Sequence, residues 1–104
     1  MARFDIHANP IAPDRADFPY VLEIQSYLLY RFAERVCVPL VRPGAVPGLT
    51  DRFNPAIDVQ RETLRLHPLG VAVFLVQELR SPVANAQTAA LDIETALDML
   101  LRGY

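Results

Sequence analysis

The residues best suited to bind a metal ion are the two histidines, His7 and His67, and the single cysteine, Cys37. Metal-binding motifs place such ligands three or four residues apart or in a C-x-x-C pair, because their donor atoms must converge on one ion. No two of these three residues have that spacing. The sequence therefore predicts no metal site, and His67, which precedes Pro68, is interpreted as a turn residue.

Motifs for phosphate binding and nucleophilic catalysis are also missing from the sequence. Four glycines, at positions 44, 48, 70 and 103, cannot form a Gly-rich phosphate loop. Ser26 falls in an expected strand and Ser81 precedes a proline, so neither has the sequence of a nucleophile elbow. Asp14 and Asp17 lie in a turn-rich segment and are interpreted as solvated turn residues. We therefore expect no catalytic residues and no cofactor, which favours a binding function.

Cys37 is expected to be a small buried side chain rather than a reactive thiol. It is the only cysteine, so it cannot form an intramolecular disulfide, and Val36 and Val38 flank it. Arg35 is the only nearby basic residue in the sequence that could favour the thiolate.

Size and charge narrow the class of partner. The 104 residues have a net charge of −2, and all ten basic side chains are arginines scattered from Arg3 to Arg102. Nucleic-acid surfaces concentrate basic residues, so we expect protein partners and no direct sequence-specific nucleic-acid binding. No apolar stretch approaches the roughly 20 residues that span a bilayer, and the first residues lack a signal-peptide pattern. We expect a cytoplasmic protein with one domain over residues 1–104 and no membrane contact.

Most of the chain is expected to form strands, because nine prolines restrict helices and 52% apolar content indicates a folded core. Strand-like patterns, each bounded by turn residues, cover 3–7, 20–26, 35–41, 56–59 and 63–67. The last two are expected to form a hairpin, and Pro39 in the third favours a bulge or an edge position. The continuous apolar run 71–76 predicts a central strand covered on both faces.

The end of the chain has a helical period. The apolar residues expected to anchor this helix on the sheet are Ile93, Leu97, Leu100 and Leu101. Asn85 or Thr88 is a candidate N-cap, and Gly103 is expected to end the helix.

Several segments resemble the CcdB family in their order, their spacing and the position of the chain end. They are Arg3 to Ile6, Val21 to Ser26, Arg35 to Leu40, Asn54-Pro55, and Ala96 to Gly103. The similarity covers nearly the whole chain. It implies a mainly β fold with one C-terminal α-helix, an SH3-like barrel of antiparallel strands that assembles as a homodimer.

The resemblance also implies a function. It is that of a toxin of a type II toxin–antitoxin system, which binds the A subunit of DNA gyrase and traps the cleaved-DNA complex until a CcdA-like antitoxin removes it. The protein would thus be a topoisomerase inhibitor and not an enzyme. In the family a Trp, a Gly and an apolar residue at the chain end contact gyrase, which assigns gyrase binding to Arg102, Gly103 and Tyr104. Arg102 in place of the Trp is the main departure, because a lost hot-spot aromatic can cost about 2 kcal/mol.

The antitoxin is expected to dock on exposed loops at residues 8–17 and 44–54. The candidate contacts are Asn9, Asp14, Arg15, Arg52 and Phe53. Two alternatives remain open. The same barrel occurs in MazF-type toxins that cleave messenger RNA, although the sequence lacks a basic stripe and an acid–base set. The chain could also be a non-toxic CcdB relative that only binds antitoxin.

Overall fold

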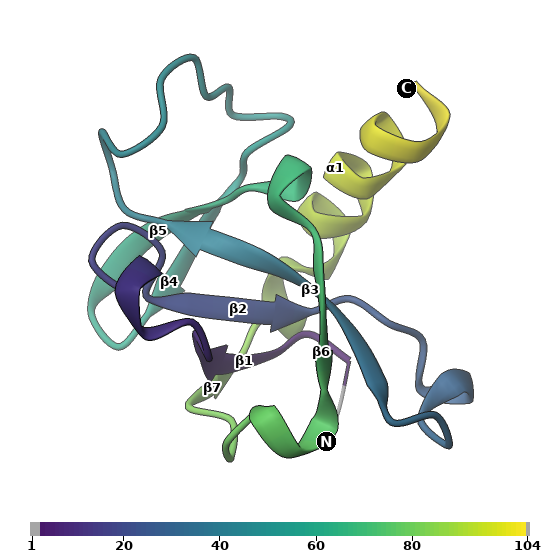
Figure 1. Cartoon of the computed structure of the whole chain (residues 1–104). Coiled ribbons are helices and arrows are strands. Elements are labelled where there is room, and N and C mark those ends of the chain that lie inside the picture. Colours follow the sequence, from purple (N-terminus) through teal and green to yellow (C-terminus); the bar gives the residue numbers. More distant parts are fainter. Residues whose placement is uncertain (1–2, 104) are drawn as a thin grey trace.

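A computed structural model describes residues 3–103, which form an antiparallel sheet curled into a nearly closed barrel with one C-terminal helix (Figure 1). The strands and the helix are β1 (Asp5–Ala8), β2 (Tyr20–Glu23), β3 (Glu34–Val41), β4 (Ala56–Val59), β5 (Glu62–Leu66), β6 (Ala72–Leu75), β7 (Ala84–Asn85) and α1 (Ala90–Arg102). Single 3-10 turns join several of these elements. The expected fold class, mainly β with one C-terminal helix, is confirmed. No helix within residues 3–103 is long and apolar enough to cross a membrane.

The long strand β3 organises the sheet. The strand order is β4-β5-β3-β2-β1-β7, and β6 pairs with β3 beside β5. On that side β3 pairs with β6 through Glu34–Cys37 and with β5 only from Leu40 onward. Pro39 lies where the neighbour changes, so its missing N–H interrupts neither ladder, and its carbonyl accepts a hydrogen bond from the His67 N–H at 3.0 Å. The expected edge position of Pro39 is thus met only locally, by the gap between β5 and β6, since β3 as a whole is a central strand.

The β4–β5 hairpin is confirmed. Its two turn residues, Gln60 and Arg61, both have positive φ, at 47° and 70°. This backbone matches the right-handed twist of the flanking strands and gives a two-residue turn, although asparagine and glycine are the usual residues there.

Side-chain alternation gives the central strands two different faces. One face is apolar and packs against α1, with Ile6, Leu22, Val38 and Leu40 fully buried. The opposite face carries Asp5, His7, Val21, Glu23, Arg35 and Cys37, all of them buried as well. The first strand was expected to be half-buried because its polar residues alternate with apolar ones. That expectation is wrong, since the segment that follows β6 covers the second face with Leu79.

The apolar run 71–76 forms β6, but not the central strand expected from its composition. Among the strands of residues 3–103, β6 pairs with β3 alone. Val73 is 60% exposed, and Val71 and Leu75 on the same side are also exposed. Phe74 points into the core, where it meets Val21 and Cys37, and the partly buried Ala72 packs against the same cluster. The prediction of a doubly covered strand is therefore wrong. An apolar sequence does not reveal whether a strand has neighbours.

Helix α1 is anchored through fewer residues than expected. Ile93 is completely buried, and Ala96 and Leu97 join it in the core. Leu101, by contrast, is 78% exposed, so the expected anchoring by Leu101 is wrong within a single chain. Neither α1 nor the 3-10 turn Gln87–Ala89 that leads into it has a side-chain N-cap, so the expected cap by Asn85 or Thr88 is wrong. Asn85 lies one residue before the N-cap of that turn, and its side-chain oxygen accepts the Gln87 N–H at 2.8 Å.

Candidate functional site

The C-terminal end of α1 projects beyond the barrel as an ordered, exposed tip (Figure 1). Gly103 ends the helix in the left-handed conformation, at φ 84°, and its N–H donates to the Asp98 and Met99 carbonyls at 3.2 Å. Glycine adopts this conformation without steric cost, so the sequence-based helix stop is confirmed. Arg102 extends from the last turn, with its Nε 4.0 Å from the Asp98 carboxylate. Tyr104 lies outside the described residues.

The expected antitoxin contacts have different environments. Asn9 is only 3% exposed, and its side chain bonds to the Phe18 carbonyl and to the Ile11 N–H, both at 2.9 Å. Its own carbonyl accepts a hydrogen bond from Arg15 Nε at 2.6 Å. Asn9 therefore holds the loop in shape, whereas Asp14 and Arg15 are exposed and accessible to a partner.

A hollow of about 210 Å³ lies beside this loop, on the face of the sheet opposite α1. Its lining is mostly apolar and includes Asn9, Asp14, Val21, Cys37, Pro39 and Phe74. Gly70 forms part of the wall, and a Cβ there would lie 2.6 Å from the Pro39 ring, so only glycine permits this close approach. Arg52 lines a separate hollow with Asp51 and Arg65, and Phe53 is half-buried. The five expected antitoxin contacts are thus not gathered in one hollow.

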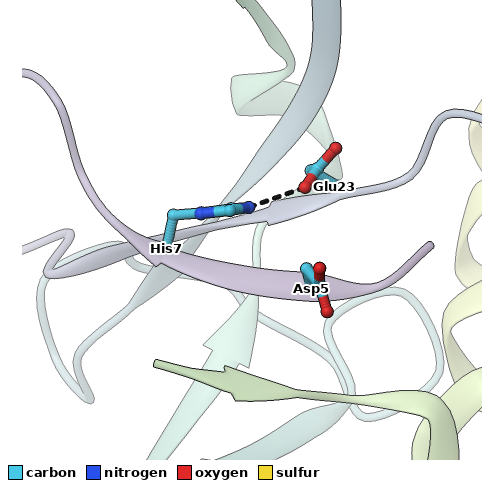
Figure 2. A group of neighbouring side chains, drawn as sticks. All are labelled: Asp5, His7 and Glu23. Atoms are coloured by element: carbon cyan, nitrogen blue, oxygen red, sulfur yellow. Dashed lines mark hydrogen bonds and ion pairs between the residues drawn. The ribbon is translucent and has the colours of Figure 1, made fainter. Parts of the chain in front are cut away.

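A third feature, Asp5, His7 and Glu23, lies inside the protein (Figure 2). One ligand-type atom of each lies within 4.8 Å of the others, and all three side chains are buried. Both ring nitrogens of His7 are already engaged, Nε2 with Glu23 Oε2 and Nδ1 with the Arg80 carbonyl, each at 2.6 Å. Arg35 Nε lies 3.6 Å from the other Glu23 oxygen, and this positive charge opposes a second cation. These contacts suit a bound proton better than a metal ion.

The sequence did not reveal this cluster because its members come from two strands, β1 and β2, and only the register of those strands brings them together. The available signal was the alternation of polar residues, Asp5 with His7 in one strand and Glu23 two positions after Val21 in the next. In a half-exposed sheet such residues face water, and a half-buried first strand would place Asp5 and His7 there.

Comparison with known proteins adds the family. Residues 3–103 match the family described as CcdB protein. The chain belongs to the CcdB family. A comparison with individual curated proteins finds no match. CcdB membership makes the chain a toxin of the toxin–antitoxin kind, and the family consists of toxins that inhibit a target rather than of catalysts.

The single cysteine of this CcdB chain gives a first test of the fold. Burial, followed by the charge of Glu23, raises the pKa of the Cys37 thiol to about 12, so the reactive thiolate is scarce at neutral pH. We expect a thiol reagent at pH 8 to leave the native protein unlabelled and to label one thiol per chain in denaturant. Rapid labelling of the native protein would show that the floor of the hollow is open to solvent.

Proposed function

We propose that this CcdB protein binds the A subunit of DNA gyrase through the end of α1 and traps gyrase on cleaved DNA. The observation that carries the proposal is the ordered, exposed tip at Arg102 and Gly103, in the position from which the family contacts gyrase. A tip capped in this way loses little conformational freedom on binding, which favours affinity.

Arg102 occupies the place of the family's Trp and must make a different contact. A planar guanidinium stacks on aromatic rings and pairs with carboxylates, so it replaces part of what an indole supplies. Its present partner, Asp98, is an exposed neighbour one helical turn earlier, and such pairs contribute less than about 1 kcal/mol. A carboxylate of gyrase that pairs with Arg102 would replace this weak contact.

We further propose that a CcdA-like antitoxin docks on the loops at residues 8–17 and 44–54. The hollow beside Asp14 accepts an apolar side chain, while Asp14 and Arg15 at its edge offer charges of both signs. A disordered antitoxin arm binds well to such a surface, because it folds onto shallow features as it docks.

We also propose that two copies of the chain form a homodimer through an exposed apolar surface. Val73 and Leu75 on β6, with Val71 just before the strand, form an exposed apolar row that faces the same side of the sheet as Val36. A groove between this row and α1 is lined largely by apolar side chains, among them Leu97 and Leu101. Exposed apolar surface of this extent is typical of protein interfaces.

A cleavage assay tests the gyrase proposal. Purified protein is incubated with gyrase and supercoiled plasmid, and linear DNA is scored after the proteins are removed. We expect linear DNA that depends on the protein, and we expect Arg102→Trp to produce it at roughly tenfold lower concentration, because a restored aromatic anchor contributes about 1–2 kcal/mol.

No linear DNA from either protein at high concentration would contradict gyrase trapping and favour a CcdB relative that only binds antitoxin. A parallel incubation with RNA tests the MazF-type alternative, and we expect the RNA to remain intact. RNA cleavage would replace the proposal with an endoribonuclease.

A further inference from the structure

We propose that His7 is held as an imidazolium inside the barrel, where it acts as a proton-dependent latch on two surface segments, residues 27–33 and 79–82. The inference is independent of gyrase and rests on the contacts of the buried cluster (Figure 2).

The hydrogen bonds of the His7 ring indicate how many protons the ring carries. The His7 ring lies between two oxygen atoms, Glu23 Oε2 and the Arg80 carbonyl, each 2.6 Å from a ring nitrogen. A carbonyl oxygen only accepts hydrogen bonds, and so does an ionised carboxylate. With Glu23 ionised, the ring must therefore donate from both nitrogens, which only the imidazolium does. A neutral ring would place a nitrogen lone pair against one of the two oxygens.

The charged groups around His7 favour the same protonation state. The charged groups facing His7 are Asp5 on β1, Glu23 on β2 and Arg35 on β3. Two carboxylates, one guanidinium and one imidazolium sum to zero, whereas a neutral His7 leaves a buried net negative charge. Tyr30 and Cys37 also face the cluster, but burial, then the Glu23 charge, raises the pKa of each to about 12, so both stay neutral at pH 7. Buried charges are tolerated when they are paired in this way.

Hydrogen bonds from His7 and Arg35 connect the buried cluster to two segments near the surface. His7 Nδ1 holds the carbonyl of Arg80, in the segment between β6 and β7. Arg35, on the other side of Glu23, donates to the carbonyls of Tyr30 at 3.1 Å and of Phe32. Residues 27–33 carry exposed apolar side chains, including Tyr27 and Leu28, and most of the other hydrogen bonds of their backbone are local turn bonds, such as that from the Tyr30 N–H to the Tyr27 carbonyl. Loss of the His7 proton makes one of its contacts repulsive and thereby loosens what the cluster holds.

The direction of the pH effect follows from the pKa of His7. Burial lowers this pKa, but the hydrogen bonds to Glu23 and Arg80, together with the charges of Glu23 and Asp5, outweigh burial and raise it above 6.5. Protonated His7 stabilises the folded chain fully below pH 6.5, the pKa of His7 in the unfolded chain. This stabilisation is lost as the pH rises through the higher pKa that His7 has in the folded chain. Within that window each pH unit lowers the folding equilibrium constant by up to about tenfold.

Nitrogen-15 NMR of the imidazole rings tests the protonation state directly. In the wild-type chain at pH 7.5 we expect both His7 nitrogens to carry a proton. In Glu23→Gln the side-chain amide donates to Nε2, so His7 becomes neutral, with one protonated nitrogen, and the fall in stability above pH 6.5 disappears. His67→Gln is the matched control, since it removes the other histidine and should leave both signals of His7 unchanged.

Amide hydrogen exchange tests the latch. As the pH rises through the His7 transition, we expect protection factors to fall about tenfold at Tyr30, Phe32 and Val83, whose N–H groups bond within or beside the two segments. The Leu66 amide, in β5, should lose protection only as far as the global free energy of unfolding falls. A neutral His7 in the wild-type chain, or loss of protection spread equally over all amides, would overturn the proposal. A rise in melting temperature on addition of Zn²⁺ at pH 7.5 would also overturn it, because the metal ion would then take the place of the proton.

Discussion

Removal of Gly103 and Tyr104 is expected to abolish gyrase-dependent killing while the barrel remains folded. In the proposed function these residues and Arg102 form the surface that meets gyrase, and loss of one hot-spot residue weakens binding by about 2 kcal/mol, or roughly 30-fold. The cost to the fold is small. Gly103 contributes one capping N–H shared between two carbonyls, and such a hydrogen bond is worth about 1 kcal/mol.

The measurement compares colony survival after induction of the full and shortened chains, with a thermal melt of each purified protein to establish that both fold. Binding of the cognate antitoxin serves as the internal control, because the loops at residues 8–17 and 44–54 are untouched by the deletion. A shortened chain that still kills at full potency would show that another surface contacts gyrase.

The sequence predicted the local structure well wherever it depends on short-range patterns. The third strand ends at Val41 as expected, the β4–β5 hairpin forms around the polar turn, and Gly103 stops the helix. Each of these depends on a backbone preference or on alternation within a few residues. The whole-chain resemblance to CcdB, which combines many such segments, is confirmed by the family match over residues 3–103.

The errors share a different cause, since they concern contacts between distant segments. Val71 to Val76 has the composition of a buried strand, but β3 offers β6 a partner on one side only. Asp5 and His7 alternate with apolar residues as in a solvated strand, yet residues that follow β6 cover them. Leu101 fits the helical period, but its side chain is 78% exposed. The end of α1 extends past the barrel (Figure 1). Sequence patterns give side-chain direction and do not show what lies opposite.

The contrast between Ile93 and Leu101 leads to the largest expected effect on stability. Both residues belong to α1, but Ile93 is completely buried between the helix and the barrel, whereas Leu101 is 78% exposed. Ile93→Ala should lower the free energy of unfolding by about 2–5 kcal/mol, because it removes buried apolar surface and leaves a cavity. That is a large part of the roughly 5–15 kcal/mol that stabilises a small domain. Leu101→Ala removes a similar side chain and should change the value by less than about 0.5 kcal/mol.

Urea unfolding at low protein concentration measures both variants, and the comparison also bears on the proposed dimer. Leu101 lines the groove between α1 and the barrel residues Val36 and Val71, so a partner chain seated there would bury it. The effect of Leu101→Ala should then grow as the protein concentration rises, since a dimer gains stability by mass action. The effect of Ile93→Ala should not change with protein concentration, because the cavity that it leaves lies inside one chain. Equal losses for the two variants at low concentration would mean that α1 packs along its whole length, contrary to the exposed helix end on which the gyrase proposal depends.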